Sequence, residues 1–263
     1  MRGYKLMESN ITCLGFQYEV GKEYSLEGEM VICKNGFHFC ENPFDCLGYY
    51  NNINGNKRLF LVEALGEVIT EVNKSVTNKI KIIEEIKDIE KFFDENIKNF
   101  KVYWGYISLY QKLSEEFIEK YKDKVDWSYI SLYHKLSEKF IEKYKNKIDW
   151  DRISIYQKLS EEFIEKYADK FDWDYISQYQ KLSEEFIEKH IDKVNWAALS
   201  ACQKLSESFI EKHTDKVDWH GISIKQKLSE SFIEKYSDKV EWDWISRCQK
   251  LSDEFRQKHN DKI

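Results

Sequence analysis

The chain has 263 residues, of which 42% are hydrophobic and 33% are charged. Its 41 Lys and Arg residues stand against 47 Asp and Glu residues, so the formal net charge is −6. This length suits one large domain or two smaller ones. Dense charges of both signs indicate a solvated, helix-rich protein and argue against a basic surface for nucleic acid. We therefore do not expect nucleic acid to be the main partner.

The sequence gives no sign of a membrane or secretory protein. No apolar run approaches the ~20 residues that a membrane-spanning helix needs. The N-terminal residues lack the apolar core and the small-residue cleavage site of a secretory signal. We expect the chain to stay in the cytoplasm of the cell that makes it, where its six cysteines would be reduced thiols.

Residues 1–86 predict a small α+β domain. This stretch holds the only proline and none of the tryptophans, and its short apolar or β-branched runs are broken by Gly and Asn. We also expect a helix over Phe44–Tyr50, capped by Asn42 and opened by Pro43, before a turn at Asn54-Gly55. The expected strands are Tyr4–Met7, Leu14–Glu19, Met30–Lys34, Arg58–Ala64 and Ser75–Ile83.

Four potential metal ligands lie close together in this part of the sequence. They are Cys33, His38, Cys40 and Cys46. Structural zinc sites usually have about two to four residues between paired cysteines, and the cysteines here are further apart. We therefore expect buried thiols in a β-rich core rather than a metal site.

Four short stretches of this part share their order with a known group of proteins. They are Gly15–Lys22, Gly36–Cys40, Ala64–Val68 and Ser75–Ile80. Together they resemble an uncharacterised N-terminal domain of phage and prophage proteins, in which the domain is joined to various repeat tails. The resemblance implies a phage or mobile-element origin and no biochemical activity.

The order of Gly36–Cys40, a helix and Leu59–Val68 is also similar to that of ADP-ribosyltransferases of the poly-ADP-ribose polymerase type. The late strand carries Asn78, Lys79 and Ile80 where that family has its catalytic glutamate. Without that carboxylate, the charge that develops in the reaction loses its main partner. The resemblance implies at most a nucleotide-binding pocket, without a catalytic residue. Its expected wall residues are Lys5, His38 and Tyr49.

From residue 104 onward, a unit of 23 residues recurs without insertion. A fixed period of this size indicates stacked structural repeats. Residues 87–103 carry apolar residues at helical spacing and predict a degenerate N-terminal cap. We assign 87–263 to an all-α solenoid of helix-turn-helix repeats, with seven repeats over 104–263. Each repeat begins with a tryptophan: Trp104, Trp127, Trp150, Trp173, Trp196, Trp219 and Trp242.

Two helices are expected in each repeat, in which we number the tryptophan as position 0. An Asp or Asn before the tryptophan caps a first helix such as Trp150–Gln157, and the serine at +10 caps a second helix of about ten residues. The apolar residues at +3, +9, +13 and +21 predict the core. The serine at +4 should bond back to a carbonyl. Pairs such as Glu162 and Lys166 should bridge within a helix.

Positions +1, +2, +5 and +6 change from repeat to repeat. Positions +2 and +6 share a helix face, and Tyr, Arg and Trp are enriched in binding hot spots. Packing of these side chains between adjacent repeats, more at +6 than at +2, is the alternative. The predicted partner-binding residues are Tyr106, Tyr129, Arg152, Tyr175 and Trp244 at +2, and Tyr133, Tyr156 and Tyr179 at +6.

These patterns favour protein recognition by the repeats and assign no cofactor. With the phage resemblance, we expect a non-catalytic protein that binds and inhibits a host factor, such as a CRISPR-type defence system, in the bacterial cytoplasm. An NAD-type nucleotide binder or ADP-ribosyltransferase-like enzyme is the first alternative. A purely structural spacer is the second.

Overall fold

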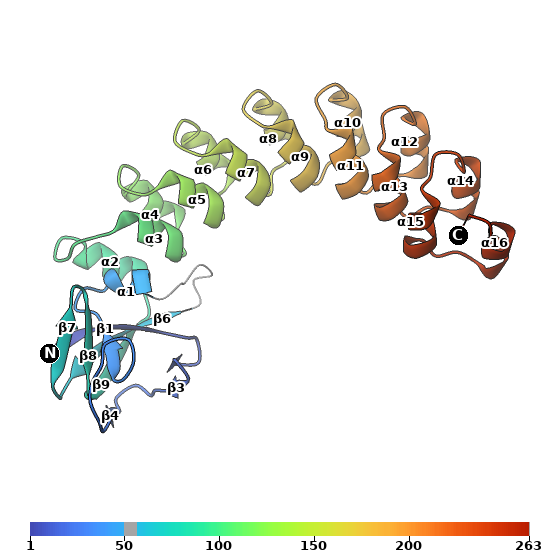
Figure 1. Ribbon diagram of the computed structural model, residues 1–263. Helices are drawn as coiled ribbons and strands as arrows, with labels where there is room; N and C mark the ends of the chain where they lie inside the picture. Colours follow the sequence, from blue (N-terminus) through green and yellow to red (C-terminus); the bar gives the residue numbers. More distant parts are fainter. Residues whose placement is uncertain (50–56, 263) are drawn as a thin grey trace. The chain divides into compact units, whose positions relative to one another are not determined.

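The computed structural model describes residues 1–49 and 57–262. They fall into two compact units, Met1–Leu136 and Ser137–Ile263, and each unit is described by itself. Strands come first in the chain and short helices follow, which confirms the predicted fold class of an α+β region followed by helical repeats (Figure 1). The boundary predicted at residue 86 falls inside the first unit, at the end of strand β9 (Lys79–Ile86).

The β-rich part of the first unit is built from antiparallel strands. Its other strands are β1 (Arg2–Met7), β2 (Thr12–Cys13), β3 (Phe16–Gln17), β4 (Glu23–Ser25), β5 (Phe37–Phe39), β6 (Arg58–Ala64), β7 (Val68–Glu71) and β8 (Lys74–Thr77). One sheet has the order β1-β6-β9-β4, a second has the order β5-β8-β7, and β2 pairs with β3 in a hairpin. Buried Phe37, Phe60, Val62 and Ile80 form part of the core of these strands.

Three of the predicted strands agree with the structure in different degrees. The prediction Arg58–Ala64 matches β6, and Tyr4–Met7 lies within β1. The stretch Ser75–Ile83, predicted as one strand, is divided between β8 and β9. The chain passes from one sheet to the other at Asn78, whose side chain accepts the N–H of Glu67 at 3.1 Å.

The other two strand predictions fail at turns. Of Leu14–Glu19 only Phe16–Gln17 is a strand, because Leu14 and Gly15 have positive φ and form the hairpin tip. The predicted strand Met30–Lys34 is wrong. There the N–H of Asn35 bonds back to the carbonyl of Val31 at 2.9 Å and closes a tight turn.

Helix α1 (Asp45–Tyr49) lies where a helix was predicted. The side chain of Asn42 accepts the N–H of Phe44 at 3.1 Å, and its carbonyl accepts the N–H of Asp45, as a helix start requires. The predicted end of this helix and the turn at Asn54-Gly55 lie outside the described residues.

Helix α2 (Ile89–Asn96) joins the strands to the repeats. Its fully buried Phe93 lies 4.7 Å from the ring of Phe44. Glu90 accepts a hydrogen bond from the Ser114 hydroxyl at 2.6 Å, and Asp94 accepts one from Lys120. The second helix of each repeat makes the same contacts with the second helix of the next repeat. Helix α2 therefore occupies the position of a second helix, as expected of a degenerate cap.

Each repeat contains a first helix that starts at the tryptophan and a shorter second helix. The first unit contains α3 (Trp104–Tyr110), α4 (Glu115–Lys120) and α5 (Trp127–Tyr133). The second unit contains α6 (Glu138–Lys143), α7 (Trp150–Tyr156), α8 (Glu161–Lys166), α9 (Trp173–Tyr179), α10 (Glu184–Lys189), α11 (Trp196–Cys202), α12 (Glu207–Lys212), α13 (Trp219–Lys225), α14 (Glu230–Lys235), α15 (Trp242–Cys248) and α16 (Asp253–Lys258).

The predicted caps and core positions are largely confirmed. Every serine at +10 accepts the N–H of the phenylalanine at +13, whereas Glu241 makes no side-chain bond to its helix. The second helices span 6 residues instead of about ten. Residues at +3 and +13 are buried, as are those at +21 from Val125 to Val240. The isoleucine at +14, such as Ile164, is also buried, which was not predicted.

Buried glutamines at +7 connect successive repeats. The amide nitrogen of Gln203 donates to the carbonyls of Ser177 and Gln180 at 2.8 and 2.7 Å. Its amide oxygen accepts the N–H of Leu182 at 3.2 Å. Gln180, Gln226 and Gln249 make equivalent bonds. One side chain thus satisfies three backbone groups of the preceding repeat.

Serine and glutamate make two further sets of contacts. The Ser200 hydroxyl donates to the carbonyl of Trp196 at 2.7 Å, as predicted, and also accepts the N–H of Asp218, the last residue before α13. The carboxylate of Glu184 accepts both the N–H and the hydroxyl of Ser206 in the next repeat. The bonds of glutamine and glutamate thus join each repeat to its neighbour.

The charged side chains of the second helices also bridge repeats. Lys166 pairs with Glu142 of the preceding repeat at 2.6 Å, so the predicted pairing with Glu162 is wrong. The reason is that adjacent second helices bring +16 of one repeat beside +15 of the other. At +17, the His190 ring lies 4.5 Å from Phe186 and 4.9 Å from Trp173, as expected for an aromatic substitute.

Candidate functional site

Position +6, at the end of each first helix, faces solvent in most repeats. In the first unit Tyr133 is 41% exposed, and in the second unit Tyr156 and Tyr179 are 58% and 49% exposed. The residues that replace tyrosine in later repeats are exposed as well; they are Cys202, Lys225 and Cys248. The predicted partner-binding residues at +6 therefore do not pack between repeats.

Position +2 packs against the preceding repeat in two of the later repeats. A Cβ added at Gly221 would lie 3.1 Å from the backbone of Ser200 and Ala201. Trp244 is half-buried, and its ring meets that of His220 edge-on at 5.9 Å. Packing between repeats, expected more at +6 than at +2, is thus found at two +2 positions.

The remaining predicted residues at +2 have partners within the chain. Tyr106 is 42% exposed but covers Gly48 of α1, where an added Cβ would lie 2.8 Å from its ring. Arg152 pairs with Asp149, the cap residue of its own helix, at 3.0 Å. Tyr129 and Tyr175 are half-buried, each with its ring 6.3 Å from the tyrosine at +6 of the same helix. They support the exposed tyrosines.

Lysine occupies three positions in all seven repeats, namely +8, +16 and +20. At +16 lysines such as Lys212 pair with a glutamate of the preceding repeat, and at +20 lysines such as Lys193 lie over a tryptophan ring. Within residues 1–49 and 57–262, no lysine at +8 forms an ion pair, and all are exposed. They are Lys112, Lys135, Lys158, Lys181, Lys204, Lys227 and Lys250.

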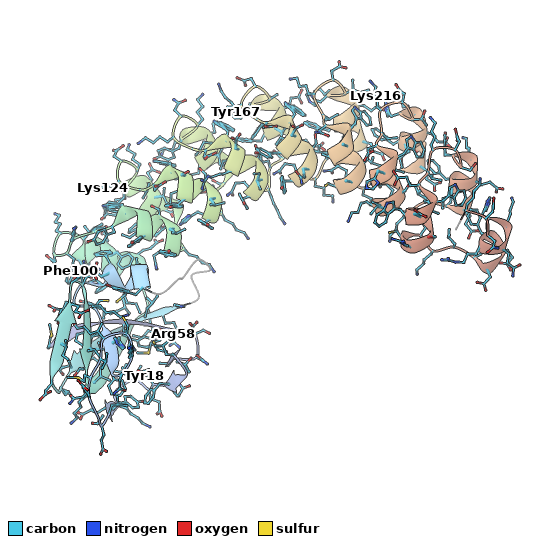
Figure 2. The ribbon with its side chains drawn as sticks, in the orientation of Figure 1. Tyr18, Arg58, Phe100, Lys124, Tyr167 and Lys216 are labelled. Carbon is cyan, nitrogen blue, oxygen red and sulfur yellow. The ribbon has the colours of Figure 1, made fainter. Side chains whose placement is uncertain are left out.

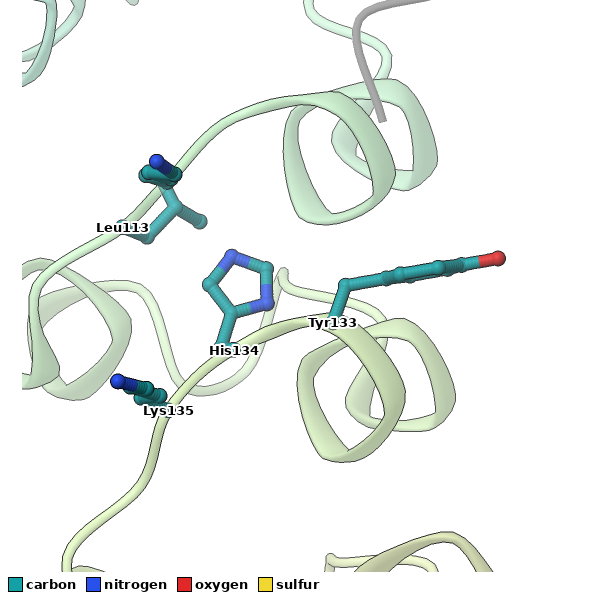
Figure 3. A pocket seen from close by; sticks show the side chains of 5 residues that line it. Leu113, Tyr133, His134 and Lys135 are labelled. Atoms are coloured by element: carbon teal, nitrogen blue, oxygen red, sulfur yellow. The ribbon is translucent and has the colours of Figure 1, made fainter. Parts of the chain in front are cut away.

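The lysines at +8 and the tyrosines at +6 point to different sides. Figure 3 shows the Tyr133 ring on one side of His134 and Lys135 on the other. The segment that carries them is extended, so buried His134 alternates with exposed Lys135. Two rows of exposed side chains therefore run along the repeats of each unit: a variable row at +6, which includes Tyr133, Tyr156 and Tyr179, and a basic row at +8.

A cavity of about 430 Å³ lies beside His134. Its lining residues are Lys112, Leu113, Tyr133, His134 and Lys135. His134 replaces the glutamine found at +7 of the other repeats, and its Nε2 lies 2.9 Å from the carbonyl oxygen of Gln111. Burial lowers the pKa of His134, which favours the neutral ring. The lining contains no acid that could act with it in catalysis.

In the β-rich part, Lys5 and His38 line one cavity of about 270 Å³, together with Tyr18. Figure 2 labels Tyr18 among the side chains of this part. Lys5 is only 2% exposed, and its Nζ donates to the carbonyl of His38 at 2.7 Å. Tyr49, the third predicted pocket residue, does not line this cavity. Its hydroxyl bonds to Asn73, and Lys74 lies over its ring.

The ring of His38 holds a turn in place. Its Nε2 accepts the N–H of Cys33 at 2.8 Å, and its other nitrogen faces the backbone of Gly36. Burial, followed by repulsion from Lys74 and Lys5, lowers the pKa of His38 to about 4. A neutral ring with both nitrogens engaged cannot serve as a general base.

Neither a cluster of metal ligands nor a membrane-spanning helix is found in the described chain. Over residues 1–49 and 57–262, His, Cys, Asp and Glu side chains nowhere gather in threes as metal ligands would. No helix in the described ranges has the length and apolar character needed to cross a membrane.

A comparison with known protein families matches the first part of the chain. A family model described as "Domain of unknown function (DUF7666)" matches residues 1–95. Neither a curated protein nor a solved structure matches the chain. The match thus spans the β-rich part and ends within α2, before the first tryptophan repeat, so that the N-terminal part of the chain is similar to a family of unknown function.

Proposed function

We propose that the chain is a non-catalytic protein that binds another protein through the exposed ends of its first helices. The observation that carries this proposal is the exposure of tyrosine at +6, which reaches 58% at Tyr156 and 49% at Tyr179. Tyrosine offers a large, rigid contact area at a low entropic cost, and it is enriched in binding hot spots.

Comparison among the repeats supports the proposal. Positions +3, +13 and +14 fill the core and carry Ile or Leu, Phe, and Ile in nearly every repeat. Position +6 carries Tyr, Cys or Lys in repeats of one architecture, so packing does not demand a particular residue there. A partner that spans several repeats would favour a different side chain at each of them.

The lysines at +8 indicate the charge of the partner. Position +12 lies four residues after the lysine at +8 and varies among Lys139, Glu162 and Ser208. The lysine at +8 therefore recurs whether or not an acidic residue stands at +12. The structure of the repeat uses its lysines at +16 and +20 but makes no contact that needs the one at +8. Complementary charge speeds association and selects partners. We therefore propose that the partner carries an acidic surface.

The resemblance of residues 1–86 to phage and prophage proteins supplies the proposed setting. The chain acts in the cytoplasm of a bacterial host, where it binds and inhibits a host factor. A CRISPR-type defence system is the proposed target, and plaque formation on a host with that system, with and without the chain, tests this setting.

Replacement of two tyrosines tests the binding surface. The variant Tyr156→Ala/Tyr179→Ala should unfold at the wild-type temperature, because both side chains are exposed. It should capture the host partner at least about tenfold less well than wild type, as measured by affinity capture and quantitative mass spectrometry. The control Glu162→Ala/Glu185→Ala changes exposed residues of second helices in the same repeats. Equal capture by both variants, or no specific capture by wild type, would contradict the proposal.

The alternative is an NAD-type nucleotide binder or an ADP-ribosyltransferase-like enzyme. It requires Lys5, His38 and Tyr49 to line one pocket, and of these only Lys5 and His38 share a cavity. We therefore prefer protein recognition. NAD-dependent labelling of host proteins by the purified chain would reverse this preference.

A further inference from the structure

The cavity beside Lys5 lies outside the surface proposed for protein binding. Its volume is about 270 Å³, and Lys5, Lys34 and Asn35 supply polar groups to its lining. Phe16 and Phe37 supply aromatic walls, with ring centroids 5.7 Å apart. Small-molecule sites likewise combine convergent polar groups with aromatic walls.

Lys5 is buried there without a carboxylate partner. It is 2% exposed, and its Nζ lies 5.5 Å from the centre of the Tyr18 ring. The groups that act on its charge are thiols, foremost that of Cys13, and no Asp or Glu lines the cavity among the described residues. Burial accordingly lowers the pKa of Lys5. A buried ammonium without a counter-charge is costly, so an anion supplied from outside would stabilise it.

The rim of the cavity contains strained and exposed backbone. Leu14 lines the cavity at φ 51° and is 91% exposed, and Cys33, next to Lys34, has φ 63°. Residues other than glycine pay about 1 kcal/mol or more for such a conformation. An apolar ligand would cover Leu14, which nothing in the described part of the chain covers.

We propose that this cavity binds a small organic anion, whose charged group pairs with Lys5 and whose apolar body lies against Phe16 and Phe37. The two lysines and the absence of acids in the lining select the negative charge, whereas the aromatic walls select a flat apolar body. Carboxylates and phosphate monoesters share this chemistry. Because the anion stabilises the charged form of Lys5, its binding weakens as the pH rises and the amine loses its proton.

Three probes test this proposal on the full chain: benzoate, phenyl phosphate and the neutral benzamide, which has nearly the shape of benzoate. The readout is the shift of backbone amide signals of Phe16, Gly36 and Phe37 in NMR titrations. Benzoate or phenyl phosphate should shift them, and the stronger of the two identifies the anionic group. Benzamide should not. The variant Lys5→Met, which keeps an unbranched apolar stem, should weaken binding by about tenfold or more. The control Lys81→Met, at a partly exposed lysine outside the cavity, should not.

The outcomes separate the proposal from its rivals. Equal shifts with benzoate and benzamide would show an apolar pocket that does not need Lys5, and this would overturn the proposal. No shift with either anion, or undiminished binding by Lys5→Met, would overturn it too. If Lys5→Met does not fold, the comparison of benzoate with benzamide on wild type over a pH series decides. Protein capture by the repeats is not involved, so this result is independent of the proposed function.

Discussion

The side chain of the glutamine at +7 forms hydrogen bonds with the backbone of the preceding repeat. Gln203 satisfies the carbonyls of Ser177 and Gln180 and the N–H of Leu182, all in the preceding repeat. A side chain of similar size without polar atoms would fill the space and leave these buried backbone groups unsatisfied. Shape and polarity are therefore both needed at this position.

Replacement of this glutamine should be strongly destabilising. We expect Gln203→Leu to lower the free energy of unfolding by about 3 kcal/mol or more, since each buried unsatisfied group costs about 1–3 kcal/mol. Urea unfolding of the full chain measures this. The exposed neighbour Tyr179→Ala should change stability by about 0.5 kcal/mol or less. A loss for Gln203→Leu no greater than that of the control would show that the backbone groups find other partners.

The first unit offers the opposite test. His134 stands at +7 and bonds to the carbonyl of Gln111. The substitution His134→Gln restores the residue of the other repeats and should raise the free energy of unfolding of this unit by about 1 kcal/mol. An unchanged or lower melting temperature would show that the histidine is the better fit there.

Titration of His38 should appear in the stability of the β-rich part. Its pKa is about 4 in the folded chain, against about 6.5 when unfolded. The stabilisation that comes from the neutral His38 ring is complete above pH 6.5. It is lost as the pH falls towards 4, and the free energy of unfolding decreases by at most about 1.4 kcal/mol per pH unit. NMR-monitored thermal unfolding of β1 and β5 between pH 7 and 4.5 measures it. His38→Asn should flatten the profile, and an equally steep profile in the variant would assign the effect elsewhere.

At the scale of the element, the helices are short and depend on caps. The second helices have 6 residues, too few to be stable alone in water. The serine at +10 bonds both to the helix it caps and to the glutamate of the preceding repeat. Cap and contact between repeats thus share one residue, so each helix forms only when its neighbour is present.

Two first helices, α3 and α15, lack a side-chain cap, and α15 can be improved by a small change. Glu241 precedes α15 but makes no bond to its backbone, whereas Asp218 accepts the N–H of Gly221 at 3.0 Å before α13. Glu241→Asp should therefore raise stability by about 0.5–1 kcal/mol. The reciprocal change Asp218→Glu should lower it by a similar amount. Calorimetric unfolding compares the two, and shifts of the same sign would refute the explanation by capping.

The repeats were predictable from sequence because their tryptophan, phenylalanine and capping residues recur at a fixed period. The strands were less so. The apolar run around Val31 suggested a strand, but Asn35 closes a tight turn there. The strands β4 and β5 have 3 residues each, too few to show an alternating pattern. The contacts of Gln203 join residues in different repeats, which composition at a single position does not reveal.

The candidate site was predictable in its residue types more than in its geometry. Positions +2 and +6 were correctly placed on one face, since Tyr175 and Tyr179 lie with their rings 6.3 Å apart. Which of the two is exposed depends on the angle at which the next repeat packs, and a helical period cannot supply that angle. For the same reason Lys5 and His38 meet, while Tyr49 bonds to Asn73 in another part of the fold.

At the scale of the whole molecule, we assign a structural role to the constant core and cap positions of the repeats and a role in the proposed binding to position +6. Core, caps and contacts between repeats recur along the chain, while +6 varies and the lysine at +8 recurs without a structural contact. The β-rich part contains the cavity beside Lys5. Our two proposals together assign a protein-binding surface to the repeats and a separate ligand site to the β-rich part.

The lysines at +8 should govern the salt dependence of partner binding. Five of them in the second unit, Lys158, Lys181, Lys204, Lys227 and Lys250, are exposed without ion pairs in the described structure. Their replacement by Gln should slow association and flatten its dependence on salt, because complementary charge acts mainly on the association rate. Surface plasmon resonance with the captured partner measures both.

The matched control replaces the five lysines at +16 of the same unit by Gln: Lys166, Lys189, Lys212, Lys235 and Lys258. It changes the net charge by the same amount but removes lysines that already pair with glutamates. Its association rate should fall less. Equal effects of the two variants would mean that the partner responds to total charge and that the row at +8 has no special role.

Because the contacts between repeats join only neighbours, the number of repeats could change in evolution without a new kind of contact. Within each unit the bonds of Gln203 and Glu184 reach one neighbour and no further. A gene that gains or loses one 23-residue segment by recombination would keep every bond type and change only the length of the exposed row. Selection could thus adjust the reach of the protein towards a new partner in whole repeats, without evolving a new interface between them.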